Sequence, residues 1–247
     1  MFPSIPLELL LTTGAILLAA YIFRGITGFG SGLIAIPLLA LFMPLTFVVP
    51  YISFVDVAAS LVHGWRHRRH TAWREVLTVL PFTILGVALA LYLLKNLDRS
   101  TLSNALGGFV LLFALYSLIG PTLNRHQCSA RWSVAAGSLG GIVGTLFGTG
   151  GPLYVIYYQL RGLSKNTFRS TIATVFLIEG GIRLVGYAAA GLYHLEILFW
   201  ITASLPLMAI GLYIGGHIHT SITQRQFQHA IGILLIISGV ALLTKTS

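Results

Sequence analysis

Two clusters of glycine interrupt a sequence that is otherwise strongly apolar. The first is GFGSG, which begins at Gly28, and the second is GTGGP, which begins at Gly148. In a membrane interior, non-helical backbone persists only where it is buried in protein or lines a wet cavity, because every N–H and C=O must be paired. A helix that starts at such a break presents unpaired N–H groups and the positive end of its dipole, an arrangement that binds anions. We therefore expect both clusters to form broken helices beside an anion site.

The residues predicted to bind the anion are those of the two clusters, together with one arginine in a later apolar stretch. They are Gly28, Phe29, Gly30, Ser31, Gly32, Gly148, Thr149, Gly150, Gly151, Pro152 and Arg183. Main-chain N–H groups would replace the water around the anion, the Ser31 and Thr149 hydroxyls would donate hydrogen bonds, and Arg183 would add positive charge. Helix packing is the competing interpretation, since small residues also let transmembrane helices approach closely. For isolated glycines such as Gly86 and Gly141 we expect packing.

A second set of candidates consists of ionisable residues within or beside apolar stretches, where a charge is expensive unless it faces a cavity or a partner. Asp56 and His63 lie seven residues apart and so near one helical face, while Glu179 and Arg183 lie four apart and can pair along one helix. Asp56, His63 and Glu179 are candidates for coupling transport to protons. The competing interpretations are an ion pair that only fixes helix packing and a solvated interfacial histidine. Arg24 borders the first cluster, where it either attracts an anion or extends to the membrane surface.

The composition indicates an integral membrane protein. Of the 247 residues, 56% are hydrophobic and only 9% are charged, and the mean hydropathy is +0.87. Soluble domains are about one quarter charged. The single cysteine, Cys128, excludes a disulfide within the chain and a cysteine-cluster metal site. The net charge of +9 lies in short gaps between apolar stretches, which indicates membrane topology and no nucleic-acid partner.

Eight apolar stretches are candidates to cross a bilayer, for which about 20 residues are needed. They are Ile5 to Phe23, Phe47 to Gly64, Val76 to Leu94, Leu102 to Ile119, Val134 to Phe147, Thr167 to Ala190, Leu195 to Gly215 and Phe227 to Leu243. Two shorter stretches, about Leu33 to Met43 and Pro152 to Leu160, follow the glycine clusters. We predict an all-α, polytopic membrane protein with eight long helices and two short, broken ones, forming one transporter domain over residues 1–247.

The chain repeats with an offset of 120 residues, which lays the first glycine cluster over the second and pairs His63 with Arg183. A chance alignment of glycines and leucines is the alternative. If the short stretches also cross, each half has five segments, within about 5–120 and 131–244, and most loop lysines and arginines face the cytoplasm. If the short stretches are re-entrant, these residues divide evenly. Because such residues favour the cytoplasm, we expect five crossings per half, which makes the second half an inverted copy of the first.

With both clusters, their offset and the short segments taken together, the chain resembles the sulfite exporter TauE/SafE family of bacterial membrane transporters. The similarity is carried by GFGSGLIAIPLL and GTLFGTGGPLYVIYY and extends from Ile16 to Leu243. It implies a multi-pass protein of the bacterial inner membrane that carries small sulfur-containing anions such as sulfite, thiosulfate or organosulfonates. It also assigns the motif role to the glycines of both clusters and to Pro152. Ser31 stands where many members have glycine, which leaves the substrate open.

We therefore expect a secondary transporter that moves a small oxyanion across the lipid bilayer by alternating access. No Walker-type GxxxxGK[ST] motif occurs, so we expect that this chain does not use ATP. No cofactor is expected. An anion channel is the alternative. A membrane-embedded enzyme would need a nucleophile with a base, or a metal cluster, at depth, and Ser138 has no evident partner. The sequence leaves open which anion is carried, the direction of transport, the coupling ion and whether the protein is a homo-oligomer.

Overall fold

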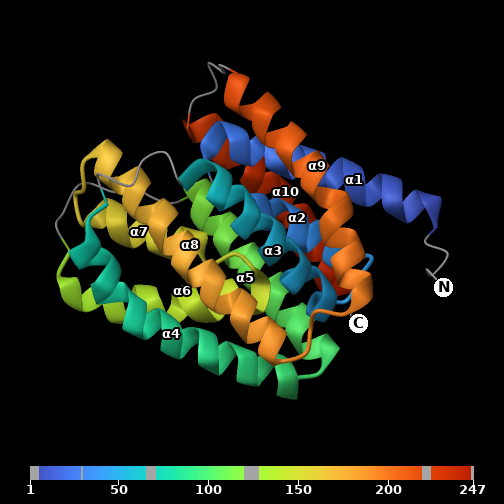
Figure 1. Cartoon of the computed structure of the whole chain (residues 1–247), viewed down its shortest axis with the longest axis horizontal. Coiled ribbons are helices and arrows are strands. Elements are labelled where there is room, and N and C mark those ends of the chain that lie inside the picture. The colour runs from blue at the N-terminus through green and yellow to red at the C-terminus, as the bar shows by residue number, and fades with distance from the viewer. Residues whose placement is uncertain (1–5, 29, 65–70, 120–127, 219–223, 246–247) are drawn as a thin grey trace. The chain divides into compact units, whose positions relative to one another are not determined.

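The computed structural model describes residues 6–28, 30–64, 71–119, 128–218 and 224–245. Within these residues the secondary structure is entirely helical (Figure 1). The α-helices are α1 (Leu7–Thr27), α2 (Ser31–Ala40), α3 (Leu45–Gly64), α4 (Trp73–Asn96), α5 (Arg99–Ile119), α6 (Ser133–Phe147), α7 (Gly151–Leu160), α8 (Lys165–Ala189), α9 (Leu195–His217) and α10 (Gln224–Lys245), and a short 3₁₀-helix, η2 (Ala130–Trp132), precedes α6. The prediction of an all-α protein with a short helix after each glycine cluster is confirmed.

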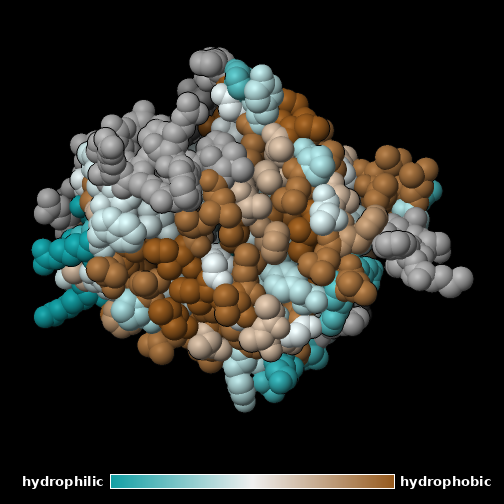
Figure 2. Space-filling view, viewed as in Figure 1, coloured by the Kyte–Doolittle hydropathy of each residue, from teal (hydrophilic) through white to brown (hydrophobic). Residues whose placement is uncertain are grey.

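Four of the described helices are long and apolar enough to cross a membrane. They are α1, α4, α9 and the Ser170–Ala189 part of α8, while α2 and parts of α3, α5 and α10 form shorter apolar helices. Large apolar side chains are exposed on these helices, such as Leu85 in α4 (64%) and Leu112 in α5 (70%). Figure 2 shows apolar residues over much of the visible face. Such a surface is unfavourable in water and favourable in lipid, as expected of a polytopic membrane protein.

The chain forms two compact units, and each unit combines helices from both halves of the sequence. The first unit consists of Met1–Val48, Asp98–Gly120 and Glu196–Ser247, and so holds α1, α2, α5, α10 and nearly all of α9. The second consists of Val49–Leu97 and Pro121–Leu195, and holds most of α3 together with α4, α6, α7 and α8. The first glycine cluster, between α1 and α2, therefore belongs to one unit, and the second cluster, between α6 and α7, belongs to the other.

The order of helices is the same in the two halves. In each half, one helix is followed by a helix of 10 residues and then by three helices of at least 20 residues. The short helices α2 and α7 start at Ser31 and Gly151, which are 120 residues apart. The helices that follow them, α3 and α8, start at Leu45 and Lys165, again 120 residues apart. The offset found in the sequence is thus also an offset of the secondary structure.

Isolated glycines let long helices approach closely within each unit. In the first unit, α1 packs against α9, where a methyl group at Gly25 would lie only 2.8 Å from the Cα of Gly215. In the second unit, α4 packs against α6, where a methyl group at Gly141 would lie 2.5 Å from the carbonyl oxygen of Thr83. A side chain at either position would separate the two backbones. The packing interpretation of Gly141 is confirmed, and Gly86 also has backbone atoms of α6 where its side chain would be.

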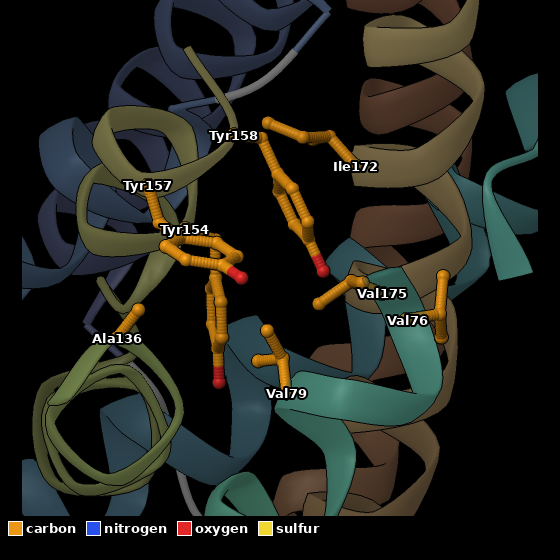
Figure 3. Close-up of a cluster of buried hydrophobic side chains, with 8 residues drawn as sticks. All are labelled: Val76, Val79, Ala136, Tyr154, Tyr157, Tyr158, Ile172 and Val175. Atoms are coloured by element: carbon orange, nitrogen blue, oxygen red, sulfur yellow. The ribbon is translucent and has the colours of Figure 1, made fainter. Parts of the chain in front are cut away.

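A cluster of tyrosines fixes the short helix α7 in the second unit. Tyr154 and Tyr158 are fully buried among apolar side chains of α4, α6 and α8 (Figure 3). Their hydroxyl groups are also engaged, since the Tyr154 hydroxyl lies 3.1 Å from the Oγ1 of Thr83 and the Tyr158 hydroxyl donates to the main-chain carbonyl of Glu75 over 3.3 Å. Buried tyrosines combine a large apolar contact area with a directed polar contact. They therefore hold the helix that begins at the second glycine cluster.

Candidate functional site

In the first unit, the glycine cluster makes a break between two helices. Gly28 caps the C-terminus of α1 with φ 87°, and its N–H donates to the carbonyl of Arg24 over 2.6 Å. Gly30 precedes the first residue of α2 with φ 94°. Both angles lie in the left-handed region, which costs a residue with a Cβ about 1 to 2 kcal/mol. The predicted break is confirmed, and two of its glycines are required by the backbone conformation.

Arg24 is buried at the start of α2. Its side chain belongs to the last turn of α1, the residue is 8% exposed, and its Nη1 donates to the Oγ of Ser31 over 3.0 Å. The Arg24 guanidinium therefore lies beside the first glycine cluster. Ser31 is the first residue of α2 and Gly32, also buried, is the second. Positive charge therefore lies where the dipole of α2 is also positive. Phe29 lies outside the described residues.

In the second unit, the glycine cluster makes the corresponding break between α6 and α7, but with different backbone angles. Gly148 caps α6 with φ 64°, whereas Gly150, which precedes α7, has φ −64° and so is right-handed. Gly150 is needed for a different reason: a methyl group there would collide with the carbonyl oxygen of Gly140 and lie 2.9 Å from the Cα of Gly144. The start of α7 therefore packs directly on the backbone of α6. Gly151 and Pro152 are the first two residues of α7.

Arg183 of α8 lies against the last turn of α6 in the same unit. Its Nη1 donates to the carbonyl oxygen of Gly144, and its Nε lies 3.1 Å from the Oε1 of Glu179. Arg183 is 7% and Glu179 is 2% exposed, so the ion pair is buried. Gly144 leaves room for it, because a methyl group at this position would collide with the Glu179 carboxylate. The pairing predicted from the four-residue spacing is confirmed, and Gly144 is a contact that the sequence did not indicate.

Two buried hydroxyl groups lie next to this break without a hydrogen-bond partner. Thr145 and Thr149, on either side of Gly148, are 0% and 2% exposed, and the Oγ1 atom of each has no partner among the described residues. Buried hydroxyl groups are nearly always hydrogen-bonded in native proteins. Thr149 directly precedes the residue that caps the N-terminus of α7. Hydrogen-bonding capacity is therefore available at the start of this helix, close in the chain to the carbonyl that Arg183 contacts.

The candidate coupling residues differ in how the structure places them. Asp56, in α3, is partly buried and interacts electrostatically with the Glu179 carboxylate. His63 is the last residue but one of α3, and its side chain is outside the described residues. The structure thus brings Asp56, Glu179 and Arg183 together in the second unit.

A polar network at the end of α7 was missed by sequence reasoning. Arg161, which follows α7, donates from Nη2 and Nε to the two carboxylate oxygens of Glu75 over 2.5 and 3.0 Å. Its Nη1 donates to the carbonyl of Cys128 over 2.8 Å, and the hydroxyl of Tyr157 donates to Glu75 over 3.3 Å. From the sequence, Arg161 is only one of the loop arginines that indicate membrane topology. Opposite charges at two helix ends are a signal that could have suggested the pair.

Comparison with known proteins shows the family of the chain. Residues 13–242 match the family model described as sulfite exporter TauE/SafE. The chain belongs to this family. It is 29% identical over 199 residues to the probable inner membrane transporter protein TsaS of Comamonas testosteroni, which covers 77% of this chain and 80% of that protein. It is 25% identical over 213 residues to the probable sulfite/organosulfonate exporter TauE of Cupriavidus necator, which covers 83% and 82%. No solved structure matches the chain.

Membership of the TauE/SafE family confirms the resemblance found in the sequence. It also makes the chain a membrane transporter and not an enzyme. Both glycine clusters, Arg24, Glu179 and Arg183 lie within the matched residues. The candidate site therefore lies within the part of the chain that the family model covers.

Proposed function

We propose that this TauE/SafE protein is a secondary carrier of the bacterial inner membrane that moves a small sulfur-containing anion by alternating access. The candidate substrates are sulfite, thiosulfate and organosulfonates. The family supports export of sulfite, one relative is named for the inner membrane, and the other for sulfite and organosulfonates. All of these anions present several oxygen atoms that accept hydrogen bonds from N–H and O–H donors.

The observation that carries the proposal is the buried guanidinium of Arg183 beside the break between α6 and α7. The Oγ1 atoms of Thr145 and Thr149 are buried there without partners, and α7 presents its N-terminus. A guanidinium, free hydroxyls and the N-terminus of a helix are donors that suit a small oxyanion. We assign the anion contacts of this unit to Gly148, Thr149, Gly150, Gly151, Pro152 and Arg183.

The first unit offers the same chemistry at the start of α2. Arg24 contacts Ser31, the first residue of that helix, and both are buried. We assign Gly28, Phe29, Gly30, Ser31 and Gly32 to anion contacts in this unit. The Ser31 hydroxyl accepts a hydrogen bond from Arg24, which places a polar group and a positive charge together at the start of α2.

We further infer that residues 5–120 and 131–244 are inverted repeats within one transporter domain. Each half contributes five helices, and the short helices start 120 residues apart. The first helix of each half also packs through glycines on the fourth helix of the other half, α1 on α9 and α4 on α6. This reciprocity supports duplication, and an odd number of crossings would invert the second copy. Inverted repeats are a common basis of alternating access.

Counterflow in proteoliposomes tests the proposed function. Purified protein is reconstituted, vesicles are preloaded with sulfite, thiosulfate, taurine, sulfoacetate or sulfate, and uptake of labelled sulfite is followed. A carrier gives saturable exchange that depends on the anion inside. Flux at the rates of ion channels, without exchange, would indicate an anion channel, and no flux with any anion would reject the proposal.

Variants of Arg183 test the site itself. Arg183→Ala removes hydrogen bonds to a charged group, so we expect apparent anion affinity to fall by about 10- to 100-fold. Arg183→Lys keeps a positive charge beside Glu179 and should bind more tightly than the alanine variant. Arg74→Ala is the matched control, since Arg74 is exposed in the first turn of α4. Transport by Arg183→Ala equal to that of the control would remove Arg183 from the site.

A further inference from the structure

Arg183 already has a negative partner in the structure. The Oε1 of Glu179 lies 3.1 Å from its Nε, and the Gly144 carbonyl accepts a hydrogen bond from its Nη1. Glu179 and Arg183 are nearly inaccessible to solvent. With both groups ionised, the buried pair has a net charge of zero. Glu179 therefore occupies the position of counter-ion that an anionic substrate would need.

A second negative charge would disturb this balance. A monovalent anion bound to Arg183 beside an ionised Glu179 gives two negative charges for one guanidinium. Net charge in a low-dielectric interior is costly, and a buried acid commonly avoids it by taking up a proton. Protonated Glu179, Arg183 and a monovalent anion again sum to zero. The buried site then has the same net charge when it is empty and when it is occupied.

We propose that Glu179 takes up one proton when the anion binds, and that the anion then replaces its carboxylate as the counter-ion of Arg183. This inference rests on the proposed function and specifies how it is coupled to protons. One O–H bond forms on the Glu179 carboxylate and the ion pair with Arg183 opens. On release of the anion, that O–H bond breaks, the proton leaves to water and the ion pair closes again. Anion and proton therefore travel in the same direction.

The other titratable groups around Glu179 limit which residue can do this. Tyr187 on the same helix and Tyr154 from α7 both interact with it electrostatically. The Tyr187 hydroxyl donates to the carbonyl of Thr145 over 2.6 Å, and the Tyr154 hydroxyl shares a hydrogen bond with the Oγ1 of Thr83. Both hydroxyls are thus engaged. Asp56 from α3 is the second carboxylate that faces Glu179, so it is the alternative proton acceptor.

Calorimetric binding measurements can count the protons. Methanesulfonate is the probe, because its single charge stays ionised across the pH range of the experiment and any proton taken up belongs to the protein. Titrations in two buffers of different ionisation enthalpy give the number of protons taken up per anion bound. For the wild type we expect about one proton at alkaline pH, with affinity falling about tenfold per pH unit there. Sulfite is the second probe, with its own protonation subtracted.

Glu179→Gln should bind methanesulfonate without proton uptake and with an affinity that no longer depends on pH. Glu196→Gln, at an exposed position in α9, is the matched control and should keep the proton uptake of the wild type. Asp56→Asn tests the alternative acceptor, and we expect it to keep the uptake as well. Loss of uptake in Asp56→Asn and not in Glu179→Gln would overturn the assignment to Glu179. An infrared difference spectrum of the wild type needs no variant, and it should show a protonated carboxyl band that appears when methanesulfonate is added.

The outcomes separate this inference from the function on which it rests. If the wild type binds either anion without taking up a proton, the coupling by Glu179 is wrong while anion transport stands. If the wild type binds neither methanesulfonate nor sulfite, the proposed function fails and the coupling fails with it.

Discussion

Glu75, in the first turn of α4, forms a bidentate ion pair with Arg161, the residue that follows α7. The two nitrogen–oxygen distances are 2.5 and 3.0 Å, and Tyr157 donates a further hydrogen bond to the same carboxylate. Bidentate geometry orients both side chains as well as attracting their charges. The pair therefore ties the end of the short helix that starts at the second glycine cluster to a long helix of the same unit.

Replacing Glu75 with glutamine should lower the stability of the protein. The change removes the charge of a partly buried pair, and we expect a loss of about 2 kcal/mol, between the values for exposed and for fully buried pairs. Thermal unfolding in detergent measures the effect as a lower midpoint temperature. Glu196→Gln is the matched control, because Glu196 is an exposed glutamate in the first turn of α9. Equal midpoints for the two variants would contradict a stabilising role of the pair.

Cys128 should report on the same network through its reactivity. Its N–H donates to the carbonyl of Leu160 over 3.0 Å, and its own carbonyl accepts from Arg161. Burial raises the pKa of the Cys128 thiol above its ordinary value. Because the thiolate is the reactive form, alkylation near neutral pH should be slower than for a cysteine in a short peptide. The rate should still be rising at a pH where the peptide has reached its maximum.

The pH profile of maleimide labelling, followed by mass spectrometry, checks this expectation. Cys128 is the single cysteine of the chain, so no other thiol contributes. In Glu75→Gln, Arg161 loses its charged partner and holds the Cys128 carbonyl less firmly, so labelling of Cys128 should be faster. A profile that coincides with that of the peptide would show that the pKa of the Cys128 thiol is not raised in solution.

The helices of the fold follow closely from the sequence because apolar stretches of this length have few alternatives in a membrane. The two short helices were predicted at about Leu33 to Met43 and Pro152 to Leu160, and the structure has them at Ser31–Ala40 and Gly151–Leu160. Hydropathy misplaces these starts because the first helical residues are small or polar. The backbone conformation decides the boundary there, and hydropathy carries no information about it.

The candidate site could be predicted only where its contacts are local. Glu179 and Arg183 lie one turn apart on one helix, so their spacing was sufficient. The contact of Arg183 with Gly144 spans 39 residues, and that of Arg161 with Glu75 spans 86. These contacts depend on which helices pack together, which no local pattern contains. The two clusters also look alike in sequence, although the backbone of Gly30 is in the left-handed region and that of Gly150 is in the right-handed region.

Gly150→Ala should be poorly tolerated because of space and not because of backbone angle. The added methyl group would meet the backbone of α6 at Gly140 and Gly144, which cannot move aside as a side chain can. We expect the free energy of unfolding to fall by about 1 to 3 kcal/mol, which is typical of overpacking, and anion exchange to be reduced. Gly108→Ala in α5 is the control, since nothing lies within 4 Å of the new methyl group. Normal unfolding and exchange in Gly150→Ala would show that α7 does not pack on α6 as described.

Tyr154 should act through packing, and its ring should matter more than its hydroxyl. Tyr154→Phe loses the hydrogen bond with Thr83, but the Thr83 Oγ1 still donates to the carbonyl of Val79. We therefore expect the free energy of unfolding to fall by only about 1 kcal/mol. Tyr154→Ala leaves a cavity in a fully buried cluster and should cost about 3 to 5 kcal/mol. Thermal unfolding of both variants measures the difference. A phenylalanine variant that folds normally but no longer exchanges anions would instead place the hydroxyl in the substrate site.

Arg24 should contribute to anion exchange through the start of α2. Its guanidinium is buried and contacts Ser31, so Arg24→Gln removes positive charge from a helix N-terminus that the carrier is proposed to use. We expect the apparent affinity for sulfite in counterflow to fall about tenfold or more, with Arg24→Lys intermediate.

Ser31→Ala removes one neutral polar group and should have a smaller effect on the apparent affinity, about fivefold. Arg74→Gln, at an exposed position, controls for the change in net charge. If Arg24→Gln binds sulfite as well as Arg74→Gln while unfolding at a lower temperature, Arg24 serves only to hold α1 against α2, and the first glycine cluster loses its charged contact with the anion.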